Sequence, residues 1–338
     1  MRDKSIDILR FIALTCIICI HVLPSPLVGG VQCLISQFRS FDVPMMVFLS
    51  GVSYQIASVK HIAYRKYVIK RFCRLILPTW VFLCVYYLLH LIYSPIGLRQ
   101  MFYFGIFYTS WYVWIIRVFF IIALFAPMVS SVVQNLKNVH YLVILAITLL
   151  VNECAAKFMC SDNPADISVL LLMNFPYLLV FSLGLMIDKF THIQCLKMAS
   201  VFLLVYLLIG GFLSFSKGEI ILTQLYKYPP RIYYLSYAFS AILILWVIRK
   251  RMIDILEKMG ILGICLFIGS HTIWIYFWHI IFVEYANDNI DTALGRLIFT
   301  YGLAVVVTIV QTRFLKSIQK CISDDEKRKK LNMIFSNR

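Results

Sequence analysis

The feature that most constrains the fold of this chain is a series of long apolar runs that follow one another from residue 6 to residue 314. Of the 338 residues, 61% are hydrophobic and only 14% are charged, and the mean hydropathy is +0.84. Such a composition excludes both a soluble globular domain and a disordered chain. The runs instead predict membrane-spanning helices, because a helix satisfies its own backbone hydrogen bonds in lipid.

We predict about ten spans in an all-α, polytopic transmembrane helical bundle. They lie near residues 6–23, 41–59, 75–94, 111–129, 141–157, 168–187, 198–215, 233–248, 265–285 and 294–314. The region from Gly260 to Ala286 is longer than one span needs, so its start is predicted to be an interfacial turn or a re-entrant piece. Residues 1–322 form the transmembrane domain in this division, and residues 323–338 form a basic cytoplasmic tail.

The basic residues are distributed in a way that indicates membrane topology. The formal net charge is +16, and most of the 32 lysines and arginines fall in alternate loops between the apolar runs. A cytoplasmic N-terminus collects this majority on the inner side, as the positive-inside rule requires. Both termini are therefore predicted to be cytoplasmic, and the charge does not require a nucleic-acid partner. The first apolar run lacks a clear cleavage site, so we expect it to be retained.

The ten cysteines show no spacing typical of a metal or redox site, so no metal is expected. Most of them lie within the predicted spans, where cysteine behaves as a small apolar residue. Cys33 and Cys160 are the two positioned to meet oxidant, and a bridge between them is one hypothesis.

Arg10 and His21 lie in the first apolar run with ten residues between them. Eleven steps of about 100° bring both side chains to one face of a helix, ~16 Å apart along its axis. Such groups are costly in lipid and usually face a bundle interior or an aqueous cavity, so the pair indicates a functional site. The alternative is a snorkelling arginine and a histidine satisfied by a neighbouring helix. Asp7, three residues before Arg10, is predicted to pair with it.

A second group of basic residues lies in the loop from Lys60 to Arg74. Arg71 and Arg74 are three residues apart and share a helical face, where two guanidinium groups can bind phosphates bidentately. Positive-inside bias alone also explains arginines at this place.

Several further polar residues interrupt the apolar runs. Asp42 opens the second span, and Gly51 in the same span permits close helix approach. Arg117 and Glu153 lie at similar estimated depths in two spans, so we expect them to form an ion pair that is either structural or part of an acceptor site.

Two aromatic-rich segments carry the remaining candidates. His279 follows Tyr276, Phe277 and Trp278 within a span, where it either takes part in chemistry or packs against a hydroxyl. Arg231 belongs to an outer loop with prolines, tyrosines and a second cation, a composition able to bind a polyhydroxylated or anionic acceptor. Tyrosines also gather at membrane interfaces without any ligand.

Taken together, these motifs resemble the integral-membrane acyltransferase 3 family over essentially the whole chain. The matching residues are Ile6 to Arg10, the spacing of Arg10 and His21, Asp42-Val43-Pro44 with Ser50-Gly51, Arg71 and Arg74, Trp111-Tyr112, and Ser270 to His279. Members of this family move acyl groups onto sugars and related acceptors at the cell surface.

The resemblance implies acetyl-CoA or another acyl-CoA as a cytoplasmic donor, with Arg10, Arg71 and Arg74 as candidates for its phosphates. It also implies that His21, together with Arg10, serves the transfer, either as a general base or by accepting the acyl group itself. The candidate substrate-binding residues are Asp42, Trp111, Tyr112, Arg117, Glu153, Arg231 and His279.

The leading hypothesis is an O-acetyltransferase of the bacterial inner (cytoplasmic) membrane, with membrane lipids around it and a surface polysaccharide or lipid-linked sugar as acceptor. A flippase or exporter of glycan intermediates also presents polar intramembrane residues and outer aromatic side chains. A structural or sensory membrane protein is the third alternative, and it leaves the polar residues inside the spans without a purpose.

Overall fold

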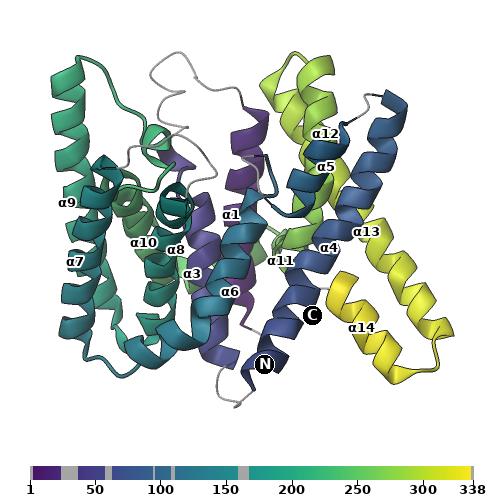
Figure 1. Cartoon of the computed structure of the whole chain (residues 1–338), viewed down its shortest axis with the longest axis horizontal. Coiled ribbons are helices and arrows are strands. Elements are labelled where there is room, and N and C mark those ends of the chain that lie inside the picture. Colours follow the sequence, from purple (N-terminus) through teal and green to yellow (C-terminus); the bar gives the residue numbers. More distant parts are fainter. Residues whose placement is uncertain are drawn as a thin grey trace. The chain divides into compact units, whose positions relative to one another are not determined.

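The computed structural model describes residues 3–23, 37–57, 63–93, 96–107, 111–158 and 167–335. Within these ranges the regular elements are helices, as Figure 1 shows, so the predicted all-α class is confirmed. They are α1 (Lys4–Val22), α3 (Asp42–Ala57), α4 (Tyr64–Tyr93), α5 (Leu98–Gly105), α6 (Trp114–Val133), α7 (Asn138–Lys157), α8 (Ile167–Met186), η1 (Ile187–Lys189), α9 (His192–Lys217), η2 (Thr223–Tyr226), α10 (Ile232–Lys258), α11 (Leu262–Ser270), α12 (Thr272–Asn289), α13 (Ala293–Cys321) and α14 (Asp325–Phe335). Cys33 and Cys160 lie outside the described residues.

The number of spans differs from the predicted ten. In the described ranges eight helices are long and apolar enough to cross a membrane, and α11 with α12 brings the number up to nine. The predicted second span corresponds to α3, which has only 16 residues. At about 1.5 Å per residue this helix is shorter than the hydrocarbon core of a typical bilayer. The chain is thus a multi-pass membrane protein, and the cytoplasmic location of its termini remains a prediction.

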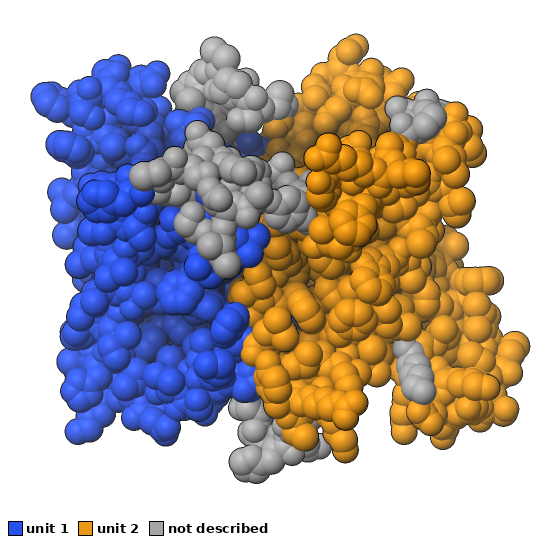
Figure 2. Space-filling view, viewed as in Figure 1, with its two compact units in different colours: residues 1–17, 25–61, 125–262 blue, residues 18–24, 62–124, 263–338 orange. Residues whose placement is uncertain are grey.

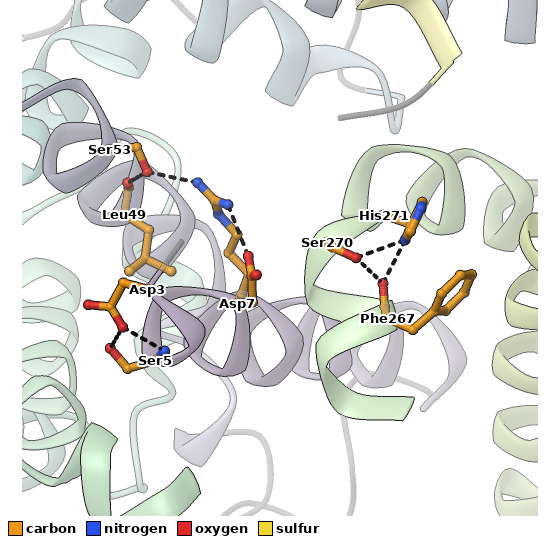
Figure 3. Close-up of polar contacts among 9 residues, drawn as sticks. Asp3, Ser5, Asp7, Leu49, Ser53, Phe267, Ser270 and His271 are labelled. Carbon is orange, nitrogen blue, oxygen red and sulfur yellow. Dashed lines mark hydrogen bonds and ion pairs between the residues drawn. The ribbon is translucent and has the colours of Figure 1, made fainter. Parts of the chain in front are cut away.

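The region from Gly260 to Ala286 is broken, as its length predicted. α11 and α12 meet at an angle of 87°, and His271 lies at the corner. The Phe267 carbonyl accepts hydrogen bonds from the backbone N–H of His271 at 3.1 Å and from the Ser270 hydroxyl at 2.9 Å. The Nδ1 atom of His271 lies 2.8 Å from the same carbonyl oxygen (Figure 3). Two side chains therefore contact a backbone carbonyl where the helix breaks.

The helix ends follow local sequence signals. α9 begins with a capping box, in which the Thr191 hydroxyl accepts from the backbone of Gln194 and the Gln194 side chain accepts from that of Thr191. The same helix ends at Gly218, whose φ of 72° is accessible to glycine at little cost.

The chain divides into two compact units, shown in blue and orange in Figure 2. Unit 1 comprises residues 1–17, 25–61 and 125–262, and in it α3 packs against α8 while α10 packs against α9, α3 and α7. A Cβ atom added to Gly51 would overlap the carbonyl oxygen of Phe181, and one added to Gly184 would overlap that of Phe48. The predicted close approach at Gly51 is confirmed, and its partner is α8.

Unit 2 comprises residues 18–24, 62–124 and 263–338. α12 packs against α13 and α4, and the buried rings of Phe82 and Phe277 stack with their centroids 4.9 Å apart. α14 packs against α4, and its last residue, Phe335, stacks on Trp274 at 5.4 Å. Residues 325–335 of the predicted tail therefore form a helix that packs within unit 2, while the division into two domains at residue 322 remains a prediction.

Candidate functional site

Arg10 and His21 lie on one continuous helix, α1, as the sequence predicts. The helix contributes its residues up to Ile17 to unit 1 and its last turn to unit 2. The contacts described below for Arg10 are made in unit 1, and those described for His21 are made in unit 2.

The guanidinium group of Arg10 is held by two oxygen atoms of unit 1. Its Nη1 lies 3.4 Å from the Asp7 carboxylate, which confirms the predicted pair, and its Nη2 donates to the Ser53 hydroxyl at 2.8 Å. Ser53 in turn donates to the backbone carbonyl of Leu49 at 2.7 Å, within α3. Figure 3 labels Asp7 and Ser53 and marks their contacts with dashed lines. The position of the arginine is therefore fixed by two helices, and Ser53 is a contact that the sequence did not indicate.

In unit 2, His21 meets a second histidine. Its Nδ1 lies 2.8 Å from Nε2 of His279, and the two rings are nearly parallel with centroids 5.1 Å apart. The ring of Tyr112 stands edge-on to His21 at 4.7 Å. The His279 side chain is completely buried, and its Nδ1 contacts the backbone carbonyl of Tyr276. Three predicted site residues from distant parts of the sequence thus form one cluster.

Aromatic side chains extend from this cluster. Tyr276 donates its hydroxyl to the Tyr112 carbonyl at 2.6 Å, which ties the segment before α6 to α12. The Trp111 ring lies 5.3 Å from Tyr112 and stacks on Phe104 of α5 at 4.4 Å. The site residues before α6 are therefore held by contacts from α5 and α12.

Glu284 of α12 is the main site candidate that the sequence reasoning missed. The Tyr86 hydroxyl donates to both of its carboxylate oxygens, at 3.1 and 3.2 Å, and Nε2 of His90 lies 3.7 Å away. The Tyr86 ring is 4.8 Å from that of Trp111. The Glu284 side chain is 32% exposed, so it is held by these contacts without being fully buried. Its signal was an acid near the end of an apolar run, which usually has a function in membrane proteins.

Arg71 and Arg74 both lie on α4, one turn apart, and both are half-buried. The guanidinium of Arg71 lies over the Tyr67 ring at 5.2 Å from its centroid. In the same part of α4, Arg65, Lys66 and Lys70 are exposed. The pair therefore differs from its basic neighbours in burial, and its binding of phosphates remains a prediction.

Asp42 is buried in unit 1 against a lysine of the loop before α10. Its carboxylate lies 3.5 Å from Nζ of Lys227, and both residues are only 2% exposed. Burial lowers the pKa of Lys227, but Asp42 and Tyr228 raise it more, so the pKa lies above its ordinary value. Asp42 thus has a charged partner inside the protein, and its predicted contact with substrate is untested.

Glu153 has a different partner from the one predicted. Its carboxylate forms an ion pair with Arg231 and accepts from the backbone N–H of Ile232 at 3.0 Å. Arg117 of unit 2 donates to the Phe107 carbonyl at 3.0 Å. The predicted pairing of Glu153 with Arg117 was wrong because similar depth along two spans does not determine which helix faces meet.

The predicted substrate-binding residues therefore divide between the two units. Unit 2 contains Trp111, Tyr112, Arg117 and His279, and unit 1 contains Asp42, Glu153 and Arg231. An imidazole in contact with a second one, with a tyrosine ring edge-on to it, can move a proton or accept an acyl group.

Comparison with known proteins agrees with this chemistry. The profile of a family described as an acyltransferase domain matches residues 3–312, which is most of the chain and includes α1 to α12. Curated proteins and solved structures give no match. Because the match extends over far more than half of its length, the chain belongs to the acyltransferase 3 family of membrane proteins.

Proposed function

We propose that the chain transfers an acetyl or other short acyl group from cytoplasmic acyl-CoA to a hydroxyl of a surface polysaccharide or lipid-linked sugar. Family membership supports the acyltransferase class. The proposal adds the donor, the acceptor and the bacterial inner membrane as the location. The observation that carries it is the contact of His21 with His279 beside Tyr112.

The chemistry required of His21 is simple to state. As a general base, His21 takes the proton of the acceptor hydroxyl while that oxygen attacks the thioester carbonyl. The carbon–sulfur bond breaks, the ester carbon–oxygen bond forms, and the imidazolium returns its proton to the leaving thiolate. As a nucleophile, His21 accepts the acyl group first and the hydroxyl then removes it, its proton balancing the released thiolate. Rapid-quench analysis for acyl-protein distinguishes the two routes.

The donor is proposed to be held by arginines. Arg71 and Arg74 are half-buried and one helical turn apart, which suits the phosphates of coenzyme A. Arg10, oriented by Asp7 and Ser53, is a further candidate for this role.

The acceptor is proposed to lie along the rings of Trp111 and Tyr86. Aromatic faces beside a carboxylate suit a sugar, because the rings cover its apolar face and Glu284 accepts from its hydroxyl groups.

The test uses membrane vesicles that contain the full chain, radiolabelled acetyl-CoA and the glycan fraction of the host envelope. Wild type should transfer label to glycan, and His21→Ala should lower the rate at least about a hundredfold. His140→Ala, at an exposed position of α7, is the matched control and should leave the rate unchanged. Equal transfer by wild type and His21→Ala contradicts the catalytic assignment, and glycan export without consumption of acetyl-CoA supports a flippase.

A second set of measurements tests the proposed binding of the acyl-CoA donor. Arg71→Gln and Arg74→Gln should each raise KM for acetyl-CoA about tenfold, because a charge-assisted hydrogen bond to phosphate is lost. Arg65→Gln, on the exposed start of α4, should leave KM unchanged. An equal effect of all three substitutions argues for general surface charge instead of a phosphate site.

A further inference from the structure

The two imidazoles of unit 2 are joined in a way that determines where their protons lie. His21 uses Nδ1 toward His279, and His279 uses Nε2 toward His21, at a distance of 2.8 Å. On its other side, Nδ1 of His279 contacts the backbone carbonyl oxygen of Tyr276. The chain of contacts therefore runs from a carbonyl through both rings of the pair.

The Tyr276 carbonyl determines which atoms donate and which accept in this series of hydrogen bonds. A carbonyl oxygen only accepts, so we assign a proton to Nδ1 of His279. A neutral His279 then has its lone pair on Nε2, where it accepts from Nδ1–H of His21. A charged His279 would be an ion buried completely inside the protein, which is costly.

We propose that His279 is a positioning residue that holds His21 with its proton on Nδ1 and its basic lone pair on Nε2. The inference rests on the proposed function and names the reacting nitrogen, which is Nε2 of His21. His279 itself touches neither substrate in this scheme, because it acts through the orientation and tautomer of its neighbour.

The arrangement also suits the charged form of His21 that the reaction creates. When Nε2 takes a proton or an acyl group, the ring becomes an imidazolium and its Nδ1–H becomes a stronger donor. The Nε2 lone pair of His279 already faces that hydrogen, so the developing charge is stabilised without rearrangement. The buried carboxylate of a catalytic triad orients its histidine by the same principle.

Packing around His279 limits movement of its ring. Tyr276 lies one turn before it on α12, with ring centroids 4.9 Å apart, and the Tyr112 ring stands edge-on at 6.1 Å. The Tyr276 hydroxyl is itself bound to the Tyr112 carbonyl. The tautomer is therefore held by backbone and ring contacts of the same cluster.

The first test reads the proton directly. The full chain with ¹⁵N-labelled histidine is examined by NMR in lipid, and His21 is assigned by loss of its signals in His21→Ala. We expect the proton of neutral His21 on Nδ1 in wild type and on Nε2 in His279→Phe, because phenylalanine offers no acceptor. A wild-type proton on Nε2 overturns the proposal, and this result does not depend on the activity of any variant.

The second test separates positioning from a structural role. His279→Phe retains an aromatic ring in the cluster, and it should lower kcat at least about a hundredfold with KM for acetyl-CoA nearly unchanged. His279→Gln brings an amide oxygen to the place of Nε2, and it should retain at least about a tenth of the wild-type kcat. Equal activity of His279→Phe and wild type contradicts the proposal. Inactive His21→Ala with fully active His279→Phe leaves the proposed function standing and removes only this inference.

Discussion

At the scale of single residues, the buried ion pair of Lys227 and Asp42 is expected to contribute to the stability of unit 1. Removing one partner of a buried ion pair leaves the other charge without compensation, at a cost of about 3–5 kcal/mol. We therefore expect Lys227→Met to lower the thermal stability of the purified protein strongly. The double variant Asp42→Asn with Lys227→Met should recover most of the loss, because no charge is then left buried.

The same pair gives a pH dependence with a definite sign. The pKa of Lys227 in the folded protein lies above its ordinary value of 10.5. The stability from this lysine is therefore fully present below pH 10.5 and is lost as the pH rises through the raised pKa. Unfolding temperatures measured across this alkaline range should fall more steeply for wild type than for the double variant, and parallel curves would speak against the pair.

Glu284 gives a prediction about the acceptor. Glu284→Gln keeps the size of the side chain but weakens its hydrogen bonds, so KM for the glycan acceptor should rise about tenfold or more. KM for acetyl-CoA should stay the same, since Glu284 contacts Tyr86 and His90 and not the arginines proposed for the donor. Glu257→Gln, at an exposed position of α10, is the control. Equal changes in both KM values point to a general defect of unit 2.

Some residues of the candidate site could be recognised from the sequence, and others could not. Arg10 and His21 were recognisable because polar groups in an apolar run are costly, and that cost can be read locally. The contact of His21 with His279 was not recognisable, since 258 positions of chain separate the two residues. Glu284 was missed because its partner Tyr86 lies 198 positions earlier in the chain, so that their contact could not be read from the local sequence.

At the scale of helices, the crossing of α3 and α8 depends on two glycines. Gly51→Ala brings a methyl group against the Phe181 carbonyl, and overpacking of this kind costs about 1–3 kcal/mol. We expect a lower unfolding temperature for Gly51→Ala and for Gly184→Ala. Gly211→Ala in α9 is the matched control, because nothing lies within 4 Å of the added atom. It should be neutral or slightly stabilising, and a loss equal to that at Gly51 would contradict the packing argument.

Helix boundaries were predictable only in part. Hydropathy located the breaking region before α12, because its apolar run was too long for one span. It also joined residues 41–59 into one span, where the helix described is the 16-residue α3. Three-dimensional packing determines which helix faces meet. The pairing of Glu153 with Arg231 therefore could not be predicted from spacing along the chain.

At the scale of the whole molecule, charge and helix count together make a prediction about topology. The described helices and the bent pair give up to nine crossings, and α3 adds a tenth if the bilayer thins to match its length. Ten crossings place both termini on one side, which the distribution of basic residues assigns to the cytoplasm. Green fluorescent protein fused to either end should fluoresce, and alkaline phosphatase fused to either end should be inactive. Opposite results at the two ends would show an odd number of crossings.

The all-α class was predictable because hydropathy is a property of each segment taken alone. The division into two units was not, since it depends on contacts between segments far apart in the chain. Unit 2, for example, combines the last turn of α1 with helices from two distant segments, residues 62–124 and 263–338.

α1 belongs to both units, and this has a mechanical consequence. Its Arg10 is hydrogen-bonded to Ser53 in unit 1, and its His21 is hydrogen-bonded to His279 in unit 2. A helix is torsionally stiff, so one residue inserted between them turns everything beyond it by about 100° and shifts it by about 1.5 Å. The side chain of His21 would then leave the helix in a different direction relative to that of Arg10. The number of residues between Arg10 and His21 therefore sets the angle between their side chains about the helix axis. An insertion or deletion changes this angle even when both side chains are kept.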